Sequence, residues 1–450
     1  MISRNTVRAF CLAGTVAILA ACHASTERRP EVAAAAVPAS LQLDVEYLSD
    51  DALEGRGTGS AGNDSAAVYI ARRFAALGLE PAGGVPAASA CTAASATSCP
   101  EAYLQRFTAR PASDAHRGIT EGRRTQNVVA ILRGTDPELR DQVVVLGAHF
   151  DHLGRSPESS LDPQAGDAIR NGADDNASGT AVVMELARVL SANPPRRSVL
   201  FVLFSGEELG LLGSLHFVDN LPVPMERVQA MVNFDMVGRL RDDRLIVYGI
   251  GTAEEMPALV QQANSAEAPL SLATVPDGFG PSDHSSFYAK GIPVLHMFTD
   301  LHEQYHRATD KANTINYAGL QRVADYATRV TRELANRDGR LTPIRTAPPS
   351  VAAGSSSSGS SAYFGSVPDM AATEGVVGMR LTGVTPGSPA DKAGIQAGDV
   401  IVQFGGVAVK DIYEYTDALR SHAPGDVVEI VAVRNGKRMT FSATLTTRGG

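Results

Sequence analysis

The chain has 450 residues, of which 44% are hydrophobic and 20% are charged, and its formal net charge at pH 7 is -9. This length favours two or three domains, and the composition is that of an ordinary soluble protein with sizeable cores. The negative charge argues against nucleic acid as a partner, because phosphate groups favour a basic protein surface.

Residues 1–21 are expected to be an export signal rather than part of a fold. Two arginines precede an apolar stretch, Phe10 to Ala20, that is too short to span a bilayer comfortably, and Cys22 follows it. This pattern resembles a bacterial lipoprotein signal with lipid attached to Cys22; an ordinary signal peptide is the alternative. Lipid would anchor the chain at the cell envelope, on the periplasmic side of a bacterial membrane and by preference the outer one, with residues 22–42 as a flexible tether.

The chain contains four cysteines. Cys11 lies within the expected signal and Cys22 would carry the lipid, so Cys91 and Cys99 remain in one small polar loop. An exported compartment permits a disulfide between these two, and two free thiols are the alternative. No cysteine is then left for a metal site.

The N-terminal part after the tether is predicted to be helical. Asn63 or Asp64 can cap a helix that ends at Gly78, with one apolar face formed by Ile70, Phe74 and Leu77. Residues 79–126 carry few secondary-structure signals.

Alternating strand and helix patterns begin at residue 127. Six apolar runs are predicted to be strands buried on both faces, at 127–132, 142–147, 198–204, 230–234, 245–249 and 292–298. Helical patterns separate several of them, at 178–190, 207–217, 254–263 and 317–336. This alternation predicts an α/β fold with a mostly parallel central sheet and helices on both faces. Ligands of such sheets bind beyond the carboxyl ends of the strands.

Acidic residues and histidines follow several of these strands. They are His149, Asp151, Asp174, Asp175, Glu207, Glu208, Asp235 and His306. Each one alone could be structural, for example an acid that complements a helix dipole. Together, carboxylates packed at one edge would repel each other unless a cation lay among them. Oxygen and nitrogen donors without thiolates suit zinc, and cobalt or manganese would fit the same donors.

The C-terminal part of the chain differs in composition. Residues 342–361 are rich first in proline and then in serine and glycine, so they cannot form a core and are predicted to be a flexible linker. Strand patterns return at 427–433 and 439–446, which makes residues 362–450 a predicted small second domain.

Five motifs carry a family resemblance. GAHFDHLG, NGADDNASG, SGEELGLLGS, NFDMVG and YHRATD, in this order, resemble the dizinc aminopeptidases related to glutamate carboxypeptidase II and the glutaminyl cyclases. The resemblance covers residues 149–336 strongly, and LEGRGTGSAGNDSAAVYIARRF more loosely. It implies a zinc-aminopeptidase-like fold for residues 43–341 and two Zn²⁺ ions.

The resemblance also implies a ligand set by position. Asp174 would bridge the two ions, and two further ligands would complete each ion, His149 with Asp235 at one and Glu208 with His306 at the other. Asp151 would orient the ring of His149, as metal-bound histidines commonly require. Asp175 would be a neighbour whose family counterpart lies across a cis peptide bond.

The same comparison gives Glu207 the role of general base. The two ions would lower the pKa of a bridging water, Glu207 would take its proton, and the hydroxide would attack the peptide carbonyl. Tyr305 resembles the phenol that steadies the oxyanion in part of the family. Asp283 and His284 would line the substrate pocket, and a structural helix cap is their alternative role. The implied function is a metal-dependent exopeptidase, an aminopeptidase acting on peptides.

Three C-terminal stretches resemble a PDZ domain of the bacterial protease-associated type. They are AYFGSVPDM, GVTPGSPADKAGIQAGDVIVQFGGVAV and the stretch from Ile412 to Arg438. The loop that would bind a chain-terminal carboxylate is Phe364, Gly365, Ser366 and Val367, and a helix with Tyr415, Ala418 and Leu419 would form the other groove wall. A packed accessory domain with an unused groove is the alternative.

Two other functions remain open from the residues. A carboxypeptidase-like or glutaminyl-cyclase-like enzyme would share the scaffold, and the cyclases bind a single zinc. A non-catalytic peptide-binding protein would have lost its metals, but the five implied ligands and Glu207 are all present, which disfavours it.

Overall fold

The computed structural model describes residues 39–84, 99–110, 121–156, 160–264, 268–344, 362–368, 378–384, 387–409, 415, 418–419 and 422–447. The predicted signal, Cys22, Cys91 and most of the predicted linker lie outside these residues. Cys99 is disulfide-bonded. Within the described ranges, every helix is too short or too polar to cross a membrane.

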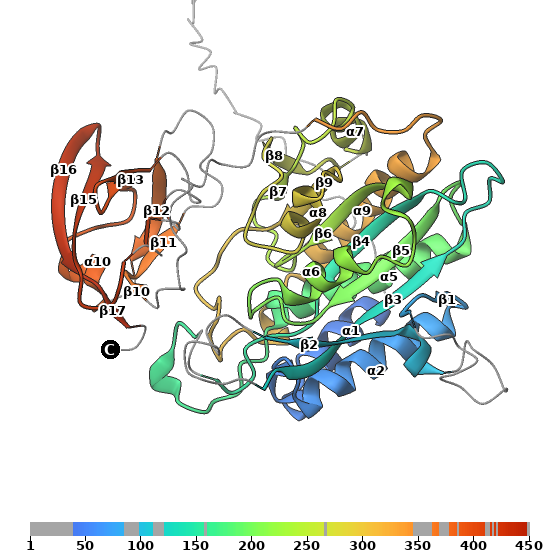
Figure 1. Ribbon diagram of the computed structural model, residues 1–450, viewed down its shortest axis with the longest axis horizontal. Coiled ribbons are helices and arrows are strands. Elements are labelled where there is room, and N and C mark those ends of the chain that lie inside the picture. The colour runs from blue at the N-terminus through green and yellow to red at the C-terminus, as the bar shows by residue number, and fades with distance from the viewer. Residues whose placement is uncertain are drawn as a thin grey trace, which may run out of the picture. The chain divides into compact units, whose positions relative to one another are not determined.

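A mixed nine-stranded sheet forms the centre of residues 39–344, in the order β1-β3-β5-β4-β6-β9-β7-β8 with β2 paired to β3 (Figure 1). The central strands β5, β4, β6 and β9 are parallel, whereas β3 and β7 run antiparallel to their neighbours β5 and β9. The sheet is mixed and parallel at its centre, as the sequence predicts, but four of its eight strand pairings in the described residues are antiparallel, so it is not mostly parallel. The strands are β1 (Glu80–Pro81), β2 (Leu104–Ala109), β3 (Arg123–Leu132), β4 (Val143–His149), β5 (Ser198–Phe204), β6 (Val228–Phe234), β7 (Arg244–Tyr248), β8 (Ser271–Val275) and β9 (Val294–Phe298).

Helices cover both faces of this sheet (Figure 1). Side chains of α1, α2, α5, α7 and α9 join one core, and those of α6 and α8 join a second core. Successive strand side chains point to opposite faces, so in β5 Phe201 packs in the first core and Phe204 in the second. The helices are α1 (Ala39–Leu48), α2 (Ala61–Ala76), α5 (Gly179–Ala192), α6 (Leu212–Asp219), α7 (Met256–Ala263), α8 (His284–Ala289) and α9 (Tyr317–Asn336).

Two predicted helix starts are wrong. The cap of α2 is Ser60, whose side chain accepts from the backbone N–H of Asn63, rather than Asn63 or Asp64. The helix expected from Glu207 begins only at Leu212, because Gly206, Gly210 and Leu211 have φ values of 80°, 106° and 60°, which a right-handed helix does not allow. Glu207 and Glu208 therefore lie in a turn.

The predicted N-terminal tether is also too long. Its last residues belong to α1, in which Leu41, Val45 and Leu48 are buried in the first core. Three strands of this sheet were not predicted at all, β1, β2 and β8. β1 has only two residues, and β2 and β8 each have several partly exposed positions and so lack a continuous apolar run.

Residues 362–447 form a smaller, β-rich unit with a core of its own, which includes Phe364, Phe404 and Tyr415. Its larger sheet has the order β11-β12-β13-β15-β16, with β14 paired to β13, and β10 pairs β17 separately. The elements are β10 (Ala362–Tyr363), β11 (Ser366–Pro368), β12 (Met379–Val384), α10 (Pro389–Lys392), β13 (Val400–Phe404), β14 (Val407–Ala408), β15 (Val427–Arg434), β16 (Lys437–Thr444) and β17 (Thr446–Thr447).

Candidate metal centre

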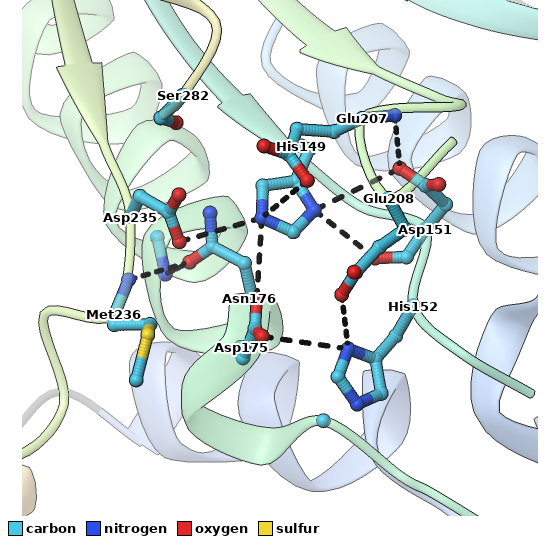
Figure 2. Close-up of polar contacts among 12 residues, drawn as sticks. His149, Asp151, His152, Asp175, Asn176, Glu207, Glu208, Asp235, Met236 and Ser282 are labelled. Carbon is cyan, nitrogen blue, oxygen red and sulfur yellow. Dashed lines mark hydrogen bonds and ion pairs between the residues drawn. The ribbon is translucent and has the colours of Figure 1, made fainter. Parts of the chain in front are cut away.

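The carboxyl ends of β4, β5, β6 and β9 bring acidic residues and histidines to one edge of the sheet. His149 is the last residue of β4, and Asp235 directly follows β6. Glu207 and Glu208 follow β5 after a two-residue turn, and His306 lies in the loop after β9. Because these four strands are adjacent and parallel, their ends meet at the same edge, as the sequence predicts (Figure 2).

Two groups of possible metal-ligand atoms lie at this edge. One group is His149, Glu207 and Asp235, and the other is His152, Asp175 and Glu208; within each group the atoms lie within 4.8 Å of one another. His306 adjoins the second group.

The carboxylate of Asp175 lies between two of the histidines. Its Oδ1 is 3.3 Å from Nε2 of His149, and its Oδ2 is 3.1 Å from Nε2 of His306. His149 Nε2 is also 3.3 Å from Asp235 Oδ1, and His306 Nε2 is 3.2 Å from Glu208 Oε2. The two pairs expected from the sequence, His149 with Asp235 and His306 with Glu208, are therefore on opposite sides of Asp175.

The expectation that Asp174 bridges these two sides is wrong by one residue. The Asp174 carboxylate faces the other way, where its Oδ1 accepts from Ser178 Oγ at 2.9 Å and from the Gly238 backbone at 2.6 Å. Its Oδ2 is 3.1 Å from Nε2 of His302. The cis peptide bond joins Asp175 to Asn176. Asp175, not Asp174, is placed to contact both sides.

The distances among these side chains fit zinc. Zinc held tetrahedrally by nitrogen and oxygen at about 2.0–2.1 Å requires ligand atoms about 3.3 Å apart. The four contacts of His149 and His306 with carboxylates are 3.1 to 3.3 Å long. The donors are imidazole nitrogens and carboxylate oxygens, which zinc accepts. These residues can therefore hold two ions that share Asp175.

His149 is held from behind by Asp151. Nδ1 of His149 donates to the backbone carbonyl of Asp151 at 3.1 Å, whereas the Asp151 carboxylate is 3.7 Å away. That carboxylate instead accepts from the backbone N–H of Glu207 at 3.2 Å and from Thr58 Oγ1 at 2.7 Å. Asp151 thus fixes the ring through its backbone, and its side chain fixes the turn that carries Glu207.

Asp310 was not predicted as a functional residue, although it ends the motif YHRATD. Its Oδ2 accepts from the backbone N–H groups of Asp174 and Asp175 at 2.9 and 3.1 Å. Its Oδ1 pairs with Arg239 at 3.1 Å. Asp310 therefore holds the backbone of the Asp175 loop in place.

Arg56, in the loosely matching N-terminal motif, was also missed. Its guanidinium is fully buried and donates to the backbone carbonyls of Phe150 at 2.7 Å, Asn171 at 2.6 Å and Gly172 at 3.0 Å, and to that of Leu48. Phe150 follows His149, and Gly172 precedes the Asp175 loop. One side chain thus connects both ligand-bearing segments to the N-terminal helices.

The charges of the cluster shift its protonation equilibria strongly. Burial alone would lower the pKa of His306, but the charge of Glu208 and the hydrogen bonds that the ring donates to Asp175 and Glu208 raise it to about 10. Burial would also lower the pKa of His149, but the charges of Glu207 and Asp235 raise it well above its ordinary value. Protons on the two imidazoles thus neutralise carboxylates here, and metal ions would replace those protons.

Glu207 and Glu208 are adjacent in the chain, yet their pKa values shift in opposite directions. Burial raises the pKa of Glu207 well above its ordinary value, and the charge of His149 offsets only part of this. Burial acts on Glu208 as well, but the charge of His306 and its hydrogen bonds lower that pKa to about 2. Glu208 therefore stays ionised, as a ligand must, while Glu207 holds a proton readily, as a general base must.

A cavity of about 230 Å³ opens onto the cluster. Beside the acids and histidines, it is lined by Met236, Tyr248, Gly280, Pro281, Ser282, His296, Phe298, Leu301 and Tyr305. Tyr305 is one of these lining residues, and burial keeps its pKa well above 10. Asp283 and His284 do not line the cavity. Both are fully buried behind it, and His284 stacks on His296 with ring centroids 4.4 Å apart.

His296 is a polar cavity residue that the sequence did not indicate. It lies within β9, where an apolar run gave no functional signal. Burial lowers its pKa to about 4, so its ring is neutral at pH 7. Its Nδ1 lies 3.2 Å from the side-chain amide of Asn233, which also donates to Ser282 Oγ at 2.8 Å.

In the C-terminal unit, the predicted carboxylate loop leads into β11, which pairs with β12 at the end of its sheet. Gly365 has a φ of 87°, and a Cβ there would lie 2.2 Å from the Cβ of Ser388, so only glycine fits. The Ser366 hydroxyl is 2.6 Å from that of Tyr415. Tyr415 and Ala418 are buried in the core, and Leu419 packs partly against it.

Comparisons with known proteins agree with this architecture. Residues 127–331 match the model for peptidase family M28, and residues 380–434 match that for the PDZ domain. Residues 127–331 are thus similar to peptidase M28 domains, and residues 380–434 are similar to PDZ domains.

Two curated relatives are aminopeptidases. The chain is 29% identical over 231 residues to aminopeptidase YwaD of Bacillus subtilis, a match that covers 49% of this chain and 47% of that protein. It is 33% identical over 192 residues to leucine aminopeptidase 2 of Trichophyton equinum, covering 40% of this chain and 35% of that one. The chain thus spans about half or less of the length of these relatives.

A solved structure shares the fold. The leucine aminopeptidase precursor from Bacteroides thetaiotaomicron superposes with a TM-score of 0.51 at 16% identity, covering 67% of this chain and 97% of that one.

Proposed function

We propose that this chain is a zinc-dependent aminopeptidase that removes N-terminal residues from peptides. The observation that carries the proposal is the arrangement around Asp175, whose two oxygens face His149 on one side and His306 on the other. A metal pair that shares one carboxylate is a common device for peptide hydrolysis. The M28 match and the aminopeptidase relatives support the same class of reaction.

Two zinc ions bound by Asp175, His149, Asp235, Glu208 and His306 would polarise a peptide carbonyl and lower the pKa of an attacking water. Every other step falls to the protein. Glu207 accepts the proton of that water and returns it to the leaving amine, for which its raised pKa is suited.

Tyr305 completes the proposed reaction centre. Its hydroxyl remains protonated at neutral pH because burial raises its pKa. It lines the same cavity as Glu207 and can donate a hydrogen bond to the carbonyl oxygen as negative charge develops there.

The cavity favours a substrate with a free amine and an apolar first side chain. Carboxylates at one side can hold an α-ammonium group. On another side Met236, Tyr248, Phe298 and Leu301 form an apolar wall, in which Met236, Tyr248 and Phe298 belong to one small hydrophobic core. We therefore expect leucine or phenylalanine at the substrate N-terminus to be preferred over aspartate.

The test compares aminoacyl and N-blocked chromogenic substrates, using the chain without its predicted signal and with metal content measured on the same sample. We expect hydrolysis of leucyl but not of N-acetyl-leucyl p-nitroanilide, with two metals per chain. Hydrolysis of the blocked substrate alone would overturn the aminopeptidase assignment. One metal per chain with cyclisation of N-terminal glutamine would favour a glutaminyl-cyclase-like enzyme.

The PDZ domain supports a second, binding function in the same chain. PDZ grooves add a peptide strand at a sheet edge and hold its terminal carboxylate on backbone N–H groups. We propose that β11 and the loop of Gly365 and Ser366 bind peptide C-termini in this way. Isothermal titration with a C-terminal peptide library and its amidated counterparts tests the proposal, since only free carboxylates should bind.

For location, we propose export and lipid attachment at Cys22, on the strength of the N-terminal sequence alone. Fractionation of cells that express the native chain and its Cys22→Ser variant tests this. The native chain should be found in the membrane fraction, and the variant should not.

A further inference from the structure

One histidine at the metal centre has no role in the proposed mechanism. His152 is buried, and its Nδ1 lies 2.8 Å from Oε1 of Glu208 (Figure 2). Its ring packs against the backbone of Gly172, where a Cβ would lie 2.5 Å from the His152 ring. Since Gly172 adjoins the Asp175 loop, the ring is fixed between that loop and Glu208.

The distances separate His152 from the metal ligands. His306 is 3.2 Å from Glu208 and 3.1 Å from Asp175, near the spacing of about 3.3 Å expected between two ligands of one zinc ion. His152 is closer to Glu208, at the length of a charge-assisted hydrogen bond, and farther from Asp175, at 3.8 Å. These are the distances of a hydrogen-bond donor to Glu208.

The two oxygens of Glu208 thereby have different partners. Oε1 contacts His152, and Oε2 contacts His306. A carboxylate that binds a metal ion is ionised and its oxygens can only accept, so Nδ1 of His152 donates the shared hydrogen. The rotation of the Glu208 carboxylate is then set by His152.

We propose that His152 is a positioning residue that holds Oε1 of Glu208 and so directs Oε2 toward the metal beside His306. The proposal rests on the metal centre of the proposed function and adds to it. It makes the two sides of the centre unequal, because His149 is held by the backbone of Asp151 whereas Glu208 is held by a side chain. Outer hydrogen bonds of this kind typically account for about 10- to 100-fold in metal affinity.

The test uses the full mature chain and three variants of His152. An asparagine amide can donate from near the position of Nδ1, a glutamine amide lies farther out, near Nε2, and leucine cannot donate. Cobalt titrations followed by visible absorption, with competition by a chelator, measure the affinity of each metal equivalent separately. His216→Ala, on α6 away from the metal centre, is the matched control.

We expect His152→Leu and His152→Gln to bind the first equivalent as the native chain does and the second about 10- to 100-fold more weakly. His152→Asn should stay within about threefold of the native chain, and so should His216→Ala. If His152→Leu does not fold, the difference in the second metal affinity between His152→Asn and His152→Gln still tests the proposal. Two unchanged affinities in the glutamine variant would overturn the proposal, and so would equal weakening in asparagine and glutamine, which would indicate that the ring itself is a ligand.

Failure of the proposed function has a different signature. A native chain that binds two metals but hydrolyses no aminoacyl substrate would disprove the aminopeptidase assignment and leave the His152 measurement intact. If the native chain hydrolyses aminoacyl substrates and His152→Gln binds both metal equivalents with native affinity, the proposed function stands and the proposed role of His152 is wrong.

Discussion

The proposed metal site at the carboxyl edge of the main sheet and the proposed peptide site of the PDZ domain differ in the polar atoms that they use, which are side-chain atoms in the first and backbone atoms in the second. At the sheet edge, the binding atoms belong to buried, charged side chains such as Asp175 and Glu208. In the PDZ domain, β11 and Gly365 present backbone, and the described core is apolar apart from the hydroxyl of Tyr415. A side-chain site depends on the identity of single residues, whereas a backbone site depends on the local fold. Substitutions should therefore affect the two regions differently.

The largest expected effect separates Asp175 from its neighbour. Asp175→Asn should lose tight binding of both metals, and turnover should fall on the order of 10³-fold, because the shared negative charge is removed. Asp174→Asn should keep two metals, since an asparagine oxygen can still accept from Gly238. Metal analysis and leucyl p-nitroanilide hydrolysis measure both. Greater metal loss in Asp174→Asn than in Asp175→Asn would return the bridging role to Asp174.

Glu207→Gln should lose about 10²- to 10⁴-fold in kcat while it retains both metals, because only proton transfer is removed. The same substitution relieves an acid whose pKa burial has raised, so the thermal midpoint at pH 8 should not fall. Steady-state kinetics and metal analysis of Glu207→Gln measure the loss of kcat and the retention of both metals. A rate within threefold of the native chain would exclude Glu207 as the base.

The metal-free protein should be most stable between about pH 4.5 and 6.5. His306 has a pKa of about 10, above its ordinary 6.5, so its stabilising contribution is complete below 6.5 and is lost as the pH rises through 10. Glu208 has a pKa of about 2, below its ordinary 4.5, so its contribution is complete above 4.5 and is lost as the pH falls through 2.

Thermal midpoints measured across pH with and without a chelator check this. Zinc should remove the alkaline loss, because bound ions replace the imidazole protons. A chelated protein whose midpoint rises from pH 6 to pH 9 would contradict the expectation.

The smallest effects on turnover are expected from substitutions in the PDZ domain. Gly365→Ala should abolish binding of C-terminal peptides, because its Cβ would clash with Ser388, while kcat on leucyl p-nitroanilide changes less than twofold. Ser366→Ala should alter peptide affinity by only a few fold, since it removes one hydroxyl contact with Tyr415. Titration calorimetry and kinetics on both variants test the contrast. A tenfold loss of turnover in Gly365→Ala would show that the two domains depend on each other.

The sequence predicted the central strands well because both their faces are buried, which produces continuous apolar runs such as β5. It missed β1, which has only two residues, and also β2 and β8, whose partly exposed positions break the run. It also extended α6 back to Glu207, because positive φ at Leu211 has no signal in the residue type. Backbone conformation in a turn is set by surroundings that a local pattern does not contain.

The same limit applies at the metal centre. The order of the motifs and the predicted strand ends located the ligand-bearing segments. Asp174 and Asp175, however, are adjacent in one loop, and the residue type does not show which of them contacts both sides of the site. Their orientation depends on two further residues. Asp310, distant in the chain, accepts from the backbone N–H of Asp175, and Ser178, four residues after Asp174, donates to the Asp174 carboxylate. His152 and Asp310 lie within the motifs GAHFDHLG and YHRATD, but neither was given a role. The residue type alone does not distinguish a side chain that holds a metal ligand in place from one that is only structural.

The position of Arg56 has a consequence for how this chain can be divided into fragments. Its guanidinium joins Leu48 to the carbonyls of Phe150 and Asn171, so residues far upstream of the matched family region complete the scaffold of the reaction centre. A recombinant fragment that starts at residue 127 would leave those carbonyls buried with no donor. Expression boundaries should therefore begin before Ala39, and a truncated product that lacks activity would say nothing about the chemistry of the intact chain.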